Sequence, residues 1–64
     1  MKVNGKDKLL ETSISVKDYL DAENYNADHI AIELDGEIIS KENYSSTMLT
    51  DNSVMEIVQF MGGG

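Results

Sequence analysis

The amino-acid sequence predicts a small α+β domain in which a sheet of about five strands has one helix packed on one face. Three observations support this prediction. Short segments rich in apolar residues are joined by the turn dipeptides Asn-Gly at 4–5 and Asp-Gly at 35–36. Helical spacing of apolar residues follows Ser15, and residues 54–60 are the most β-prone stretch. A length of 64 residues allows one domain and one modest core.

The N-terminal segment predicts a hairpin. Residues 1–3 alternate apolar and polar side chains, and Asn4-Gly5 suits a type I′ turn, in which both central residues need a positive φ. We expect the returning strand over residues 6–11, with Leu9 and Leu10 as its apolar pair.

The helix is expected to begin after Ser15, whose hydroxyl can accept a hydrogen bond from the backbone N–H of Asp18. Asn24 tolerates the left-handed conformation that often ends a helix. The apolar stripe of this helix consists of Val16, Tyr19 and Leu20. A helix of about two turns is not stable alone, so it must pack against the sheet.

The middle of the chain predicts a second hairpin. Alternation over residues 30–34 predicts a half-buried strand, and the Asp-Gly turn leads into a further strand at 37–39. Residues 40–44 resemble a short capped turn of helix. Met48 and Leu49 are expected to fill the gap beneath this crossing segment, before a polar turn at 50–53.

The last strand is apolar on both faces. Met55 and Ile57 fall on one face, and Val58 and Phe60 fall on the other. Because one short helix covers only one face of a sheet, we expect Met55 and Ile57 to join the core and Val58 and Phe60 to form an exposed strip. Such strips often mark contact surfaces. The alternative is that neighbouring side chains cover them.

The composition argues against several function classes. Twelve acidic residues stand against five lysines, and the net charge of −7 argues against nucleic acid and anionic membranes as partners. The absence of cysteine and the single histidine exclude a zinc–thiolate or multi-histidine metal site within one chain. Apolar runs of two or three residues exclude a membrane-spanning helix, and the lack of a leader predicts a cytoplasmic protein.

Charged side chains offer few catalytic candidates. His29 precedes a predicted buried strand and is interpreted as a surface or structural residue. Glu33, Glu37 and Glu56 are interpreted as solvated, or as rim contacts to a basic partner. No bound cofactor or metal is predicted.

The C-terminal end divides the chain into a domain at 1–61 and a tail at 62–64. Gly62, Gly63 and Gly64 have no side chains to pack, so we expect a flexible thread that delivers the terminal carboxylate of Gly64. A carboxylate is a poor electrophile and needs activation, for example as an acyl-adenylate. A separate protein must supply that step, because the chain has no glycine-rich phosphate loop. The alternative is a frayed end.

The whole pattern resembles the ThiS family, the sulfur carriers of thiamine biosynthesis. The resemblance covers essentially the full length and rests on the Asn-Gly hairpin, Ser15-Val16, residues 30–39, the turn at Asp51, residues 54–58 and, most specifically, the glycines at 62–64. It implies the ubiquitin-like β-grasp fold, with a mixed sheet. The sequence departs from the family pattern at Asn24, where glycine is common, and at Asn52-Ser53, where Gly-Asp is more usual.

The resemblance also implies a mechanism. A ubiquitin-activating-like adenylyltransferase would use Mg and ATP to adenylate Gly64, and Gly62 and Gly63 would give access. Sulfur from a cysteine desulfurase pathway would leave a thiocarboxylate, which donates sulfur to thiazole synthase. The chain would be a protein co-substrate, not an enzyme. The candidates for partner docking are Val58, Phe60 and Met61.

Two alternatives stay open. One is a carrier of the type found as the small subunit of molybdopterin synthase, which shares the fold. The other is a non-conjugating ubiquitin-like binding module that works through Val58 and Phe60 while its tail does nothing.

Overall fold

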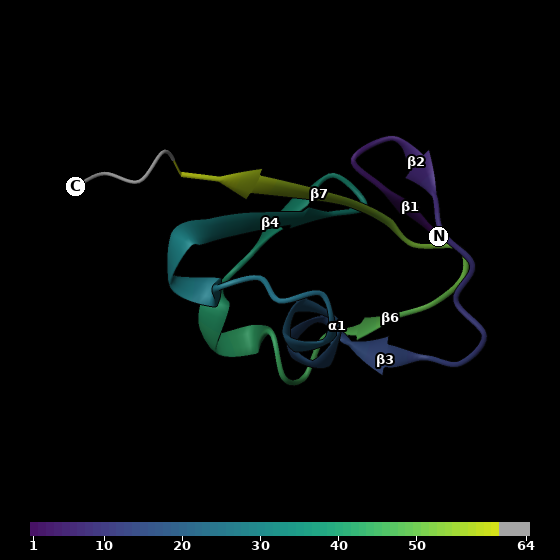
Figure 1. The fold of residues 1–64 in the computed structure, drawn as a ribbon, viewed down its shortest axis with the longest axis horizontal. Helices are drawn as coiled ribbons and strands as arrows, with labels where there is room; N and C mark the ends of the chain where they lie inside the picture. Colours follow the sequence, from purple (N-terminus) through teal and green to yellow (C-terminus); the bar gives the residue numbers. More distant parts are fainter. Residues whose placement is uncertain (61–64) are drawn as a thin grey trace.

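The computed structural model describes residues 1–60, so the predicted tail at 62–64 and the docking candidate Met61 lie outside the described residues. One α-helix packs on a mixed five-stranded sheet, which confirms the predicted fold class (Figure 1). No helix within residues 1–60 is long and apolar enough to cross a membrane.

The main sheet brings the beginning and the end of the described chain together at its centre. Its order is β2-β1-β7-β4-β5. The pair β1–β7 is parallel and the other pairs are antiparallel. The strands are β1 (Lys2–Val3), β2 (Lys6–Asp7), β4 (Ile30–Leu34), β5 (Glu37–Ile39) and β7 (Val54–Gln59).

The first hairpin forms as predicted, but its second strand is shorter. Asn4 and Gly5 have φ values of 52° and 81°, the left-handed values that the turn requires. The expectation of a strand over 6–11 is wrong because β2 ends at Asp7. The N–H of Lys8 still donates to the carbonyl of Met1 over 2.8 Å, and the chain then departs, leaving Leu9 80% exposed.

The helix α1 (Val16–Ala22) begins and ends where the sequence predicts. The hydroxyl of Ser15 accepts a hydrogen bond from the N–H of Asp18 over 3.0 Å, and Asn24 has a φ of 62°. Figure 1 shows α1 on one side of the main sheet, together with a second, two-stranded sheet. That sheet pairs β3 (Ile14–Ser15) with β6 (Met48–Leu49) and was not predicted.

The pairing of β3 with β6 corrects one expectation about the core. Leu49 is fully buried as predicted, whereas Met48 is 51% exposed and does not fill the gap. The reason is that successive side chains of a strand point to opposite faces, so only one of two neighbours can point inward.

The second hairpin also follows the prediction. Asp35 and Gly36 have φ values of 50° and 88°, and they join β4 to β5. Residues 40–44 include the 3-10 helix η2 (Lys41–Asn43), although the side chain of Ser40 makes no capping hydrogen bond. A further 3-10 helix, η1 (Ala27–His29), precedes β4 and was not predicted.

The core lies between α1 and one face of the main sheet. Alternate residues of β4 and β7 point into it, as the sequence predicts. Its buried apolar residues are Met1, Val3, Val16, Tyr19, Leu20, Ile30, Ile32, Leu34, Tyr44, Leu49, Met55 and Ile57. The opposite face of the sheet therefore has no helix of residues 1–60 packed on it.

Candidate functional site

Strand β7 is the element from which the C-terminal residues continue. It lies between β1 and β4 in the main sheet, and Figure 1 shows it leading away from the N-terminus toward the opposite end of the molecule. At its end, the N–H of Phe60 donates to the carbonyl of His29 over 2.9 Å. The predicted functional group, the carboxylate of Gly64, lies beyond the described residues.

The start of β7 is fixed from two sides. The carboxylate of Asp35 accepts a hydrogen bond from the N–H of Val54 over 2.9 Å, and the hydroxyl of Ser53 accepts one from the N–H of Thr50 over 2.9 Å. The ammonium group of Met1 lies 3.0 Å from Oδ1 of Asp51.

The carboxylate of Asp51 is therefore held as an anion. Hydrogen bonds from the Met1 ammonium and from the N–H of Leu10, together with the ammonium charge, keep the pKa of Asp51 below its ordinary value. These contacts connect the chain start, the segment after β2 and the turn before β7.

The side chain of Asn4 extends the contact between β1 and β7. Its backbone N–H donates to the carbonyl of Met55 over 2.9 Å. Its Oδ1 accepts from the N–H of Ile57 over 2.7 Å, and its Nδ2 donates to the carbonyl of Ile57 over 3.3 Å. The side-chain amide thus pairs with both backbone groups of Ile57, as the backbone of a further strand residue would.

The sequence pattern predicts only the turn role of Asn4, and its hydrogen bonds to Ile57 were not predicted. Asp and Gly also suit a type I′ turn, but of these three residues only Asn has a side chain that can both donate and accept hydrogen bonds at neutral pH. That difference is the one signal in the sequence that could have pointed to it.

The predicted exposure of Val58 and Phe60 is confirmed. Their exposed fractions are 55% and 57%, whereas Met55 and Ile57 are buried. The role of Val58 and Phe60 in docking stays a prediction, as does that of Met61.

The sheet register adds further apolar residues beside this strip. Val54 shares the alternation of Val58 and is 46% exposed. Ile38 on β5 is 80% exposed and lies opposite Glu33 of β4. This placement was not predicted, because it depends on the register between β4 and β5. We call the surface formed by these alternate residues of the five strands the open face: Lys2, Asp7, Ala31, Glu33, Ile38, Val54, Glu56, Val58 and Phe60.

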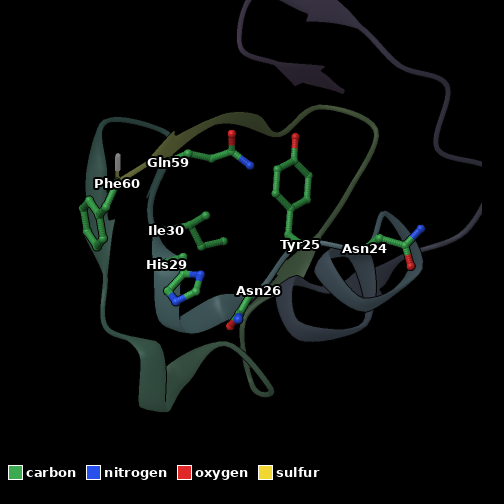
Figure 2. A pocket seen from close by; sticks show the side chains of 7 residues that line it. All are labelled: Asn24, Tyr25, Asn26, His29, Ile30, Gln59 and Phe60. Carbon is green, nitrogen blue, oxygen red and sulfur yellow. The ribbon is translucent and has the colours of Figure 1, made fainter. Parts of the chain in front are cut away.

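A shallow pocket of about 340 Å³ lies at the end of β7 (Figure 2). Tyr25, from the loop after α1, and Gln59, from β7, lie along one side of it, and His29 and Phe60 lie farther round. Its lining is mostly polar, so the predicted surface or structural role of His29 agrees with its position. Glu37 is exposed on β5, opposite Leu34 and outside the open face.

The site has the chemistry of a contact surface. Within residues 1–60, no three histidine, aspartate or glutamate side chains gather as metal ligands. The geometry supplies a central strand that is paired on both sides and an exposed face on which apolar and charged side chains mix. In the sequence, the glycines at 62–64 follow shortly after this strand.

Comparisons with known proteins agree over the whole chain. The model of the ThiS family matches residues 1–64. The sulfur carrier protein ThiS of Bacillus subtilis is 37% identical over 65 residues, covering 100% of this chain and 98% of that protein. A thiazole synthase of Paramagnetospirillum magneticum is 31% identical over 62 residues, which cover 97% of this chain and 19% of that enzyme.

The fold agrees as well. The crystal structure of a thiamine biosynthesis protein (ThiS) from Geobacter metallireducens superposes with a TM-score of 0.83 at 33% identity, covering 98% of this chain and 96% of that one. A mixed five-stranded sheet with one packed helix is thus a β-grasp fold, and the chain belongs to the ThiS family.

Proposed function

We propose that this chain is a sulfur carrier of thiamine biosynthesis that works through the terminal carboxylate of Gly64. The observation that supports this most strongly is the match to the ThiS family over residues 1–64, which includes the glycines at 62–64. The protein is a co-substrate and not an enzyme: its partners perform the chemistry on its main-chain end.

The terminal carboxylate needs activation before it can accept sulfur. Its ordinary pKa of about 3.3–3.7 makes it an anion at neutral pH, and an anion resists nucleophilic attack. A ubiquitin-activating-like adenylyltransferase converts it to an acyl-adenylate with ATP and Mg, both bound by that enzyme. The terminal sulfur of a protein persulfide, loaded by a cysteine desulfurase, then attacks the acyl-adenylate and displaces AMP. A thiol cleaves the S–S bond of the resulting acyl persulfide and is itself oxidised to a disulfide, and the product is a thiocarboxylate on Gly64.

The second partner is thiazole synthase, which takes the sulfur into the thiazole ring. The similarity between this chain and a segment of a thiazole synthase supports the pairing of the two activities. Gly62 and Gly63 allow the thiocarboxylate to enter a narrow site because they have no side chains.

The open face provides the docking surface for both partners. Val58 and Phe60 are apolar, more than half exposed and close in sequence to the tail, and Met61 follows directly. Because Val58 and Phe60 are 55% and 57% exposed, a partner that buries them gains roughly half of the 1.5–3 kcal/mol that full burial of an exposed large side chain contributes. Because both partners use the same face, they bind one at a time.

Reconstitution tests the carrier chemistry. The chain is incubated with the cognate adenylyltransferase, ATP and a sulfur donor, and its intact mass is measured. We expect a gain equal to the replacement of one oxygen by sulfur, located on Gly64 by fragmentation. Deletion of Gly64, or an extension beyond it, abolishes the gain. An unchanged mass, with an enzyme that thiolates its own established carrier, would contradict the proposal.

Genetic rescue separates this function from the related molybdenum-cofactor carriers. We expect the gene to restore growth of a strain that lacks its thiamine sulfur carrier and not of one that lacks the molybdopterin synthase small subunit. The opposite pattern would reassign the pathway while leaving the tail chemistry in place.

A further inference from the structure

We propose that Asn4 is a latent deamidation site, which the folded protein keeps unreactive by bonding the side-chain amide of Asn4 to Ile57. The reaction becomes possible when β1 separates from β7, and its products cannot restore both hydrogen bonds. Opening of this part of the sheet is thereby recorded in the covalent structure. The inference concerns the N-terminal turn and is independent of the chemistry of the tail.

The dipeptide Asn4-Gly5 contains the two groups that deamidation requires. The backbone nitrogen of Gly5 attacks the side-chain carbonyl carbon of Asn4, Cγ, and gives up its proton. The bond from Cγ to Nδ2 breaks, ammonia leaves with that proton, and a succinimide ring remains. Water then opens the ring at either carbonyl, which yields aspartate or isoaspartate. Glycine favours the attack because it has no side chain beside its nitrogen.

Burial does not protect this dipeptide. Asn4 and Gly5 are both exposed. Within residues 1–60, no atom outside the neighbouring residues lies within 4 Å of the place where a side chain on Gly5 would begin. Water therefore reaches the reacting atoms, and any restraint on the reaction must come from the way in which Asn4 is held.

Three hydrogen bonds hold Asn4 on β7. Its backbone N–H donates to the carbonyl of Met55 over 2.9 Å. Its Oδ1 accepts from the N–H of Ile57 over 2.7 Å, and its Nδ2 donates to the carbonyl of Ile57 over 3.3 Å. Ring closure brings Cγ into a covalent bond with the nitrogen of Gly5 and expels Nδ2. The amide must therefore leave Ile57 before it can react.

The opening that releases the amide is local. Strand β1 has two residues, and only Lys2 and Val3 are in register with β7. Local openings of a short terminal strand cost less free energy than global unfolding. The rate of deamidation in the folded protein is then the rate in an unfolded chain, multiplied by the fraction of molecules in which β1 is detached.

The products fit the site less well than Asn4 does. Aspartate can still accept from the N–H of Ile57, but at neutral pH its carboxylate has no donor for the carbonyl of Ile57. Isoaspartate adds a carbon atom to the main chain of a turn whose geometry fits two residues. Either product therefore favours the detached state in which it formed, and each opening that leads to reaction makes later openings more frequent.

The test is the rate of deamidation at residue 4, measured by mass spectrometry of the N-terminal peptide at one pH and temperature. The samples are the folded chain, the chain unfolded in guanidinium chloride and a synthetic peptide of residues 1–10. We expect the folded chain to react at least about 30-fold more slowly than the other two. A folded chain that reacts within about threefold of the peptide overturns the proposal.

A variant that loosens β1 tests whether opening controls the reaction. Val3→Ala removes buried methyl groups from β1 and leaves the dipeptide unchanged, so deamidation of the folded chain should become about tenfold faster. The matched control is Ile38→Ala, which truncates an exposed side chain on β5 at the far edge of the sheet and should leave the rate unchanged. Equal rates in Val3→Ala and the wild type would contradict control by opening.

The consequence of the reaction is tested with Asn4→Asp, which supplies the aspartyl product directly. This variant should unfold at a lower guanidinium concentration than the wild type at neutral pH, because one of the two bonds to Ile57 is lost. An unchanged midpoint would refute the claim that the product cannot restore the contact. Thiolation of Gly64 can succeed or fail without changing any of these results.

Discussion

The two faces of strand β7 contain similar apolar side chains in opposite settings. Met55 and Ile57 point toward α1 and are buried, whereas Val58 and Phe60 point away from it and are more than half exposed. The difference arises because the sheet has only one helix of seven residues to cover it, and such a helix covers one face. The face that stabilises the free protein and the face proposed to dock partners are thus separated along a single strand.

The largest effect on stability is expected on the buried face. Met55→Ala removes a fully buried side chain at the centre of the sheet, and should lower the free energy of unfolding by about 2–5 kcal/mol. Urea unfolding followed by circular dichroism measures the change. A cost below 1 kcal/mol would show that the core around β7 is loosely packed.

A smaller loss is expected where β1 meets β7. Asn4→Gly keeps a residue that accepts a positive φ but removes both side-chain hydrogen bonds to Ile57. We expect a cost of about 1–3 kcal/mol in urea unfolding. The matched control is Asp35→Gly, which also keeps the turn and removes a single hydrogen bond, to the N–H of Val54. Equal costs for the two variants would mean that the second bond of Asn4 adds nothing.

Acid should weaken the attachment at the start of β7. The pKa of Asp51 is lowered in the folded protein, mainly by its hydrogen bond from the Met1 ammonium, so its contribution is present above the ordinary pKa of 3.8. The contribution is lost as the pH falls through the lowered, folded-state value. Unfolding measured from neutral pH to pH 2 should show a shallower acid-side slope for Asp51→Asn than for the wild type. If the free energy of unfolding of the two proteins fell with pH at the same slope, Asp51 would not contribute to acid sensitivity.

The smallest effect on stability is expected on the open face. Phe60→Ala should change the free energy of unfolding by no more than about 0.5 kcal/mol, because its side chain is 57% exposed. The affinity of the Phe60→Ala variant for the adenylyltransferase should nevertheless fall, which calorimetry would measure. A large loss of stability with unchanged affinity would reverse the comparison between the two faces.

The parts of the fold that local chemistry determines could be predicted from the sequence. Asn4-Gly5 and Asp35-Gly36 specify their turns through positive φ values, Ser15 starts the helix, and alternation assigns Met55 and Ile57 to the core. Each of these signals lies within a few residues of the structure that it produces.

The remaining features depend on contacts between distant segments. Strands β3 and β6 have two residues each and pair across more than thirty positions, so neither shows a periodic pattern of its own. The bonds from Asn4 to Ile57 and the juxtaposition of Glu33 with Glu56 appear only when the register of β7 is known. The tail chemistry rests on the glycines at 62–64 and on membership of the ThiS family.

The most direct test of the account is the mass of the C-terminal peptide from protein isolated from its native cells. The account predicts that a fraction of the molecules ends in a thiocarboxylate on Gly64, and that this fraction disappears when the adenylyltransferase gene is deleted. A peptide that always ends in an ordinary carboxylate, in cells that are actively making thiamine, would contradict it.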